Sequence, residues 1–171
     1  MAFTFGIKAI KSGDPGAKGA MGNSLSTHDE TLEGTAVLDT TDETINWIST
    51  EESGRRLAIP QNDSETTLTF EIADPSLETQ AYYLGVDDFD PGVDDTLQIP
   101  RTQKAMHKSF LVETVEGYHI QIPYGRVNAK PLGGTITRDG VMTMQVQVFA
   151  ELPEDDNYGR IAFVDPDAVI E

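Results

Sequence analysis

The sequence contains no cysteine, which excludes a disulfide framework, thiol catalysis and thiolate metal ligands. Basic residues are also few: 12 Lys and Arg stand against 29 Asp and Glu, giving a formal net charge of −17 at pH 7. Such a chain lacks the cationic surface that ordinary binding to nucleic acid or anionic lipid requires. Long apolar runs are missing too, and the N-terminus does not follow the pattern of a secretion signal. We therefore expect no membrane insertion and no cleaved leader.

Patterns that carry catalysis or bind metal ions are missing as well. His28, His107 and His119 are scattered, without cysteines or carboxylates at metal-ligand spacing. No GxSxG, HExxH or GxxxxGK[ST] motif occurs, and the aspartates of the loop at residues 86–100 are out of step with an EF-hand calcium loop. A carboxylate pair arranged as in a glycosidase stays open at this stage. We predict that the protein is not an enzyme and has no catalytic residue, cofactor or metal ion.

The clearest strand lies at residues 65–73. Leu68, Phe70 and Ile72 alternate there with Thr67, Thr69 and Glu71. A period of two gives one apolar and one polar face, which predicts a strand buried on one side.

The only convincing helix signal follows directly, over residues 75–84. Asp74 offers a capping oxygen, Pro75 suits the first helical turn, and Gly85 suits a helix end. The apolar residues recur at helical spacing, so one stripe is expected to pack on a core; they are Leu77, Ala81 and Leu84.

The rest of the chain indicates short strands joined by polar turns. Strands are expected at residues 3–10, 34–39, 44–49, 55–60, 142–148 and 160–165, with Trp47 in the core. Residues 108–127 predict a hairpin that turns at Glu116-Gly117. If Val115 pairs with Tyr118, the hairpin's shared face contains Leu111, Val115, Tyr118, Ile120 and Ile122.

These signals predict one mainly β domain over residues 1–171, with two packed antiparallel sheets in a sandwich or barrel-like arrangement and one flanking helix. The segment around residues 11–26 is glycine-rich, and we expect it to be flexible.

Charge is uneven along the chain. Residues 31–100 hold 16 acids against Arg55 and Arg56, whereas residues 101–150 hold 3 acids against 6 bases. Such asymmetry suits a subunit whose unlike faces meet, although solvated loops explain it equally well.

The order of these features resembles the tail tube, or major tail, proteins of long-tailed bacteriophages. The likeness spans roughly residues 33–152. It is carried by EGTAVLDTTDETINWISTEESG, TLTFEIADPSLETQAYYLG, FLVETVEGYHIQIPYGRV and TITRDGVMTMQVQVFAEL. The strand that runs into DPSLETQAYYLG is the most specific part, followed by the late order of hairpin, Gly-Gly segment and long alternating strand.

The resemblance implies a structural virion protein that is made in the bacterial host cytoplasm and assembles into six-fold rings. Stacked rings would form a tube that conducts viral DNA during ejection, without specific binding. Expected partners are further copies of the chain, the tail tip or baseplate, the tape measure protein and the tail terminator. An acidic wall repels phosphate and lets DNA slide. We expect Glu71, opposite the apolar face of its strand, and Glu113, on the hairpin, to face this lumen.

Two other classes of protein stay open on the sequence. One is a secreted β-sandwich binding module, for which Trp47 or the pair Tyr82 and Tyr83 would supply an aromatic platform. The other is a different virion component, such as a tail terminator or a capsid decoration protein. A contractile sheath around the tube is neither indicated nor excluded.

Overall fold

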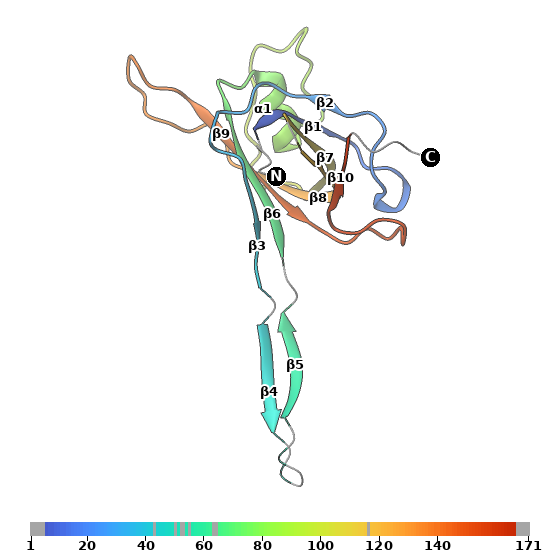
Figure 1. Cartoon of the computed structure of the whole chain (residues 1–171). Coiled ribbons are helices and arrows are strands. Elements are labelled where there is room, and N and C mark those ends of the chain that lie inside the picture. The colour runs from blue at the N-terminus through green and yellow to red at the C-terminus, as the bar shows by residue number, and fades with distance from the viewer. Residues whose placement is uncertain are drawn as a thin grey trace.

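The computed structural model describes residues 6–42, 44–49, 51, 54, 56–62, 65–115 and 117–166. The mainly β fold with a single α-helix is confirmed for this part of the chain (Figure 1). In chain order the elements are β1 (Ile7–Gly13), η1 (Ala17–Gly19, a 3₁₀ turn), β2 (Ser26–Thr27), β3 (Val37–Thr40), β4 (Thr44–Ser49), β5 (Arg56–Asn62), β6 (Thr66–Ala73), α1 (Leu77–Leu84), β7 (Met106–Thr114), β8 (His119–Ala129), β9 (Thr143–Ala150) and β10 (Ala162–Val164).

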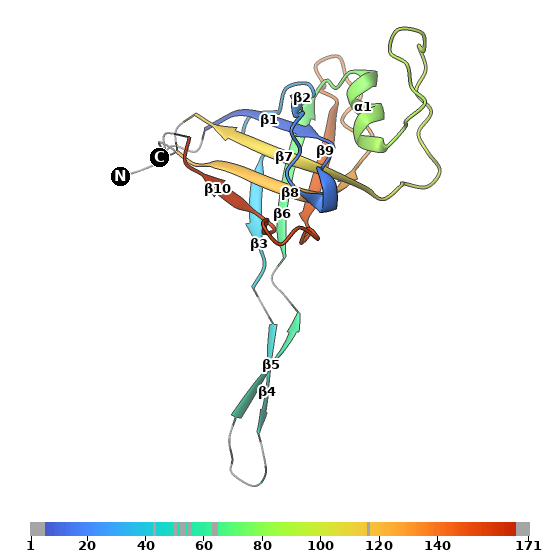
Figure 2. The ribbon, with the colours of Figure 1, turned by 90° about the vertical axis from the view of Figure 1, so that its right-hand side faces the viewer.

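Eight strands form one antiparallel sheet in the order β2-β1-β7-β8-β9-β6-β3, with β10 also paired to β8. Strands β4 and β5 pair only with each other among the described residues. Figure 2 shows β1, β7, β8 and β10 running across β3, β6 and β9. Where the sequence predicted two separate sheets, these strands thus belong to one continuous sheet. Its two halves, β1, β7, β8 and β10 on one side and β3, β6 and β9 on the other, run across each other.

The core lies between these two halves. Phe70 of β6 and Phe110 of β7 have ring centroids 6.4 Å apart, although β8 and β9 separate the two strands in the sheet order. The sheet must therefore fold back for its inner faces to meet. The predicted alternation of β6 is confirmed, since Leu68, Phe70 and Ile72 are all buried. Burial of each such side chain contributes roughly 1.5–3 kcal/mol.

Two residues of β8 help the sheet to bend. Pro123 has no backbone N–H, and its carbonyl accepts a hydrogen bond from Ser109 Oγ at 2.6 Å, where the β7–β8 register shifts. A Cβ added at Gly125 would lie 2.5 Å from Val148 Cγ1 of β9. Only glycine therefore permits this close approach of β8 to β9.

Helix α1 begins later than predicted. Its N-cap is Ser76, whose Oγ accepts a hydrogen bond from the Thr79 backbone N–H at 3.3 Å, so the expected Asp74 cap is wrong. Gly85, in the left-handed conformation at φ 74°, ends the helix as predicted.

The buried face of the helix also differs from the prediction. Ala81 and Leu84 are buried, together with Tyr83, but Leu77 is 40% exposed. Leu77 is the first helical residue, and it lies one turn before the part of α1 that packs on the sheet. Tyr83 supplies the contact instead, since its ring lies edge-on to Phe70 and its hydroxyl is 3.2 Å from Ser12 Oγ.

The glycine-rich segment, which we expected to be flexible, lies against the sheet. The Gly22 backbone N–H donates to the buried Ser109 Oγ at 3.0 Å. A Cβ at Gly22 would lie 2.2 Å from the Asp14 carbonyl oxygen, so the loop closes on itself only with glycine there. Further along, the Lys18 carbonyl accepts a hydrogen bond from the Asp155 N–H, which ties this segment to residues near the C-terminus.

The β7–β8 hairpin forms with the predicted register over residues 106–108, where Met106 pairs with Val127, but over residues 110–112 the register differs by one residue from the prediction. Val112 pairs with Ile120, and Leu111 pairs with Gln121. A shift of one residue exchanges the two faces of a strand. Phe110 and Val112 are therefore buried, whereas Val115 and Tyr118 are exposed. Of the predicted turn, Glu116 lies outside the described residues.

Candidate functional site

The β4–β5 hairpin projects from the body of the molecule and is its most distinctive surface (Figures 1 and 2). Its strands pair through contacts such as Trp47 opposite Ala58. Trp47 is 56% exposed, and Ile45 and Ile48 are exposed as well. The prediction that Trp47 belongs to the core is therefore wrong, because its strand leaves the body of the sheet.

This hairpin is apolar on both of its faces. Ile45 and Trp47 point to one side and Ile48 to the other, because successive side chains alternate along a strand. The guanidinium carbon of Arg56 lies 5.3 Å from the centre of the Trp47 ring, a cation–π contact. An isolated two-stranded hairpin is marginally stable in water, and exposed apolar clusters typically mark contact surfaces.

Two loops, residues 86–105 and 130–142, extend at the end of the molecule opposite the hairpin (Figure 1). Each carries a highly exposed apolar side chain, Val93 in the first and Ile136 in the second. In the first loop, the Asp90 carboxylate accepts the Gly92 backbone N–H at 2.9 Å. No group of three or more His, Cys, Asp or Glu in the described part of the chain is placed to hold a metal ion.

Glu71 lies on the outer face of β6, away from the core. It pairs with Gln145 of β9, and its neighbour Thr69 pairs with Gln147. The adjoining β8 places Asn128 opposite Gln147. This outer face is therefore polar around Glu71, and it also carries the charged Arg126 and Asp39, the half-buried Phe149 and the exposed Val37.

Glu113 lies on the outer face of the other half of the sheet, so the structure does not bring the two predicted acids together. Lys11 Nζ is 2.7 Å from Glu113 Oε1, and the Glu113 side chain is 18% exposed. The hydrogen bond from Lys11 lowers the pKa of Glu113. The core therefore lies between Glu71 and Glu113.

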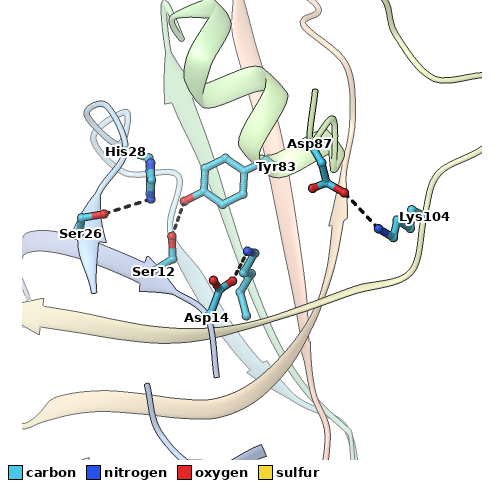
Figure 3. Close-up of polar contacts among 8 residues, drawn as sticks. Ser12, Asp14, Ser26, His28, Tyr83, Asp87 and Lys104 are labelled. Atoms are coloured by element: carbon cyan, nitrogen blue, oxygen red, sulfur yellow. Dashed lines mark hydrogen bonds and ion pairs between the residues drawn. The ribbon is translucent and has the colours of Figure 1, made fainter. Parts of the chain in front are cut away.

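The three histidines belong to separate surroundings. His28 stacks on Tyr82 with ring centroids 3.8 Å apart, its Nε2 is 3.3 Å from Ser26 Oγ, and burial lowers its pKa (Figure 3). His107 stacks on Tyr124, and its Nε2 is 2.8 Å from Glu151 Oε2. The structure does not unite these histidines in one site.

A groove of about 1070 Å³ lies beside the base of the hairpin, lined in part by Thr66, Arg126 and Glu151. Glu151 is engaged there by His107. The lining mixes charges of both signs, such as Arg126 and Glu151.

Comparison with known proteins adds no identity. No family model matches the sequence, and no curated protein matches it. Within the described residues, no helix is long and apolar enough to cross a bilayer.

Proposed function

We propose that this protein is the subunit of a bacteriophage tail tube, which assembles with copies of itself into stacked, hexameric rings that conduct viral DNA. The observation that carries the proposal is the projecting β4–β5 hairpin with its exposed Trp47, Ile45 and Ile48. Such a surface is unfavourable in water and favours a structure in which another molecule covers it. The order of sequence elements that resembles tail tube proteins supports the same conclusion.

The unlike ends of the molecule favour open or ring-shaped assembly. The hairpin projects at one end, and the loops at residues 86–105 and 130–142 occupy the other (Figure 1). A contact between two different patches repeats from head to tail, and it generates rings or filaments instead of a closed dimer. A tube of stacked rings needs both the closed repetition of a ring and the open repetition of a filament along its axis.

The charge of the chain agrees with a conduit for DNA. A net charge of −17 disfavours retention of phosphate on the surface. Of the two acids expected in the lumen, Glu113 is neutralised by Lys11, whereas Glu71 lies on a polar sheet face. We assign the lumen wall to the Glu71 face. The other partners would be the tail tip or baseplate, the tape measure protein and the tail terminator, in a virion whose parts are made in the bacterial cytoplasm.

Electron microscopy of the concentrated protein tests this proposal. The wild-type chain should form hollow tubes or stacked rings in the absence of DNA. Trp47→Ala should abolish or strongly weaken stacking while leaving the circular dichroism spectrum and the melting temperature of the subunit nearly unchanged, because Trp47 contributes little to the core. Trp47→Phe is the matched control, and it should retain assembly.

Other outcomes would favour other functions. A wild-type protein that stays monomeric at high concentration and is absent from purified virions would contradict the tube and favour a secreted binding module. Single rings or isolated trimers on virions would instead indicate a terminator or a decoration protein.

A further inference from the structure

The order of strands in the eight-stranded sheet runs from β2 to β3, and no pairing among the described residues joins these two ends. The end strand β2 has only two residues, so it leaves most of the outer edge of β1 uncovered. Strand β1 pairs with β7 along its length, but in the described part of the chain its other edge pairs only at Lys11 and Ser12, with β2. Strand β3, at the opposite end of the sheet, pairs only with β6 among the described residues. The backbone at residues 7–10 is therefore available to an additional strand.

A groove of about 710 Å³ lies between these two ends. Gly6 and residues 7–10 of β1 form one wall, and residues 29–36 form much of the other. The second wall continues the far end of the sheet, since the Leu32 N–H donates to the Glu71 carbonyl of β6 at 2.8 Å. Ile7 is exposed in the groove, and Leu32 and Ala36 are half-buried. An open strand edge thus adjoins a groove whose lining is partly apolar and partly polar.

The charge on the groove is predominantly negative. Glu30 and Glu33 are exposed on one wall, against Lys8 on the other. Asp29 is already engaged, because its Oδ2 accepts the Ser76 backbone N–H at 2.7 Å. The groove therefore favours an extended segment that combines apolar side chains with positive charge.

We propose that this groove receives the β4–β5 hairpin of a second copy of the chain, by addition of a strand to the edge of β1. The inference rests on the proposed self-assembly and names the surface that accepts the hairpin. The hairpin carries uncovered apolar side chains, and Arg56 with its neighbour Arg55 supplies the only bases between residues 31 and 100. In its own subunit the hairpin projects away from the body, so this site must be filled by another copy (Figure 1).

The docking mode follows from strand geometry. Main-chain hydrogen bonds would join the hairpin to residues 7–10 of β1, and alternate side chains would enter the groove. Arg56 would then lie near Glu30 and Glu33, in a rim contact that sets register and orientation. The hairpin and the groove are different patches of the same chain. Each subunit would therefore insert its hairpin into one neighbour and receive the hairpin of another, so that the contact repeats along the tube.

Site-specific cross-linking tests the docking, because the natural chain has no cysteine that would interfere. The Ile45→Cys variant, changed on the hairpin, is mixed with the Leu32→Cys variant, changed in the groove. A short bismaleimide is then added under assembly conditions to cross-link neighbouring thiols. We expect a cross-linked species of twice the subunit mass, several-fold more abundant than either variant gives alone. Val93→Cys in the acidic loop replaces Leu32→Cys as the matched control, and Ile7→Cys is the second groove position if Leu32→Cys does not fold.

A charge exchange gives a second measurement. Glu30→Lys with Glu33→Lys should raise the protein concentration needed for assembly on the order of tenfold, and Arg56→Glu added to the same chain should restore part of the loss. Tubes of the cysteine variants in which Ile45→Cys is cross-linked to Val93→Cys and to neither groove position would overturn the docking site and leave the tube intact. A wild-type chain that does not self-associate would overturn both the docking site and the proposed function.

Discussion

Lys11 and Glu113 form a salt bridge between neighbouring strands whose residues are 102 positions apart in the chain. The pair lies on the outer face of the sheet, with Glu113 less exposed than Lys11. Its hydrogen bond makes Glu113 more acidic in the folded chain than in the unfolded one. The stabilisation is therefore fully present above the unfolded pKa of a glutamate, about 4.3, and is lost as the pH falls through the lower folded pKa.

Glu113→Gln should consequently lower the free energy of unfolding at pH 7 by at most about 1 kcal/mol, the range of partly exposed ion pairs. The difference from the wild type should shrink as the pH falls below about 4, where the wild-type carboxyl also becomes neutral. Urea denaturation across this pH range measures it, with the exposed Glu154→Gln as control. A difference of the same size at pH 3 would show that the ion pair is not its cause.

Single residues were predictable where the local pattern decides their burial, and not where distant partners decide it. The alternation of Leu68, Phe70 and Ile72 correctly identified a core face, because both neighbours of β6 in the sheet share its two-residue period. Trp47 has an equally good local pattern, but its strand pairs outside the main sheet. The partner of Glu113 depends on the pairing of β1 with β7, which no local pattern reveals.

At the scale of elements, the two leucines of helix α1 differ in burial, and the buried one should contribute more to the stability of the subunit. Leu84→Ala should destabilise the subunit by about 2–5 kcal/mol, since Leu84 is 3% exposed and its loss leaves a cavity. Leu77→Ala makes the same chemical change at a position that is 40% exposed, and we expect a loss below about 1 kcal/mol. Chemical denaturation of both variants measures the two losses. Equal losses at the two sites would contradict the observed helix placement.

Elements were easier to predict than their pairing. The helix was predicted from its end signals within two residues, since Gly85 and the residues after Asp74 act locally. The β7–β8 register was missed by one residue over residues 110–112 but not over residues 106–108, because the irregularity at Ser109 between them is not visible in the local pattern. The fold of the glycine-rich segment was missed as well, since its contacts to Ser109 and Asp155 come from far along the chain.

At the scale of the whole molecule, the proposed assembly and the proposed passage of DNA would use different surfaces. The β4–β5 hairpin and the groove between β1 and residues 29–36 are the surfaces that we propose for assembly. The face around Glu71 is mostly polar, with Thr67, Thr69, Gln145 and Gln147 beside it. If assembly uses the hairpin and the groove, a change of charge on the Glu71 face should alter the passage of DNA and leave the tube intact.

The last prediction follows from this separation. Glu71→Lys should still form tubes, because Glu71 belongs neither to the β4–β5 hairpin nor to the lining of the groove, but each ring would then repeat a positive charge along its wall. At low salt the variant tubes should retain double-stranded DNA through many weak phosphate contacts, and the retention should fade as salt rises. In a phage that carries the substitution, genome delivery should be slowed while electron microscopy shows normal tails. Glu154→Lys makes the same change of charge on another exposed surface, and it should behave as the wild type. Normal delivery through normal Glu71→Lys tails would remove this face from the lumen.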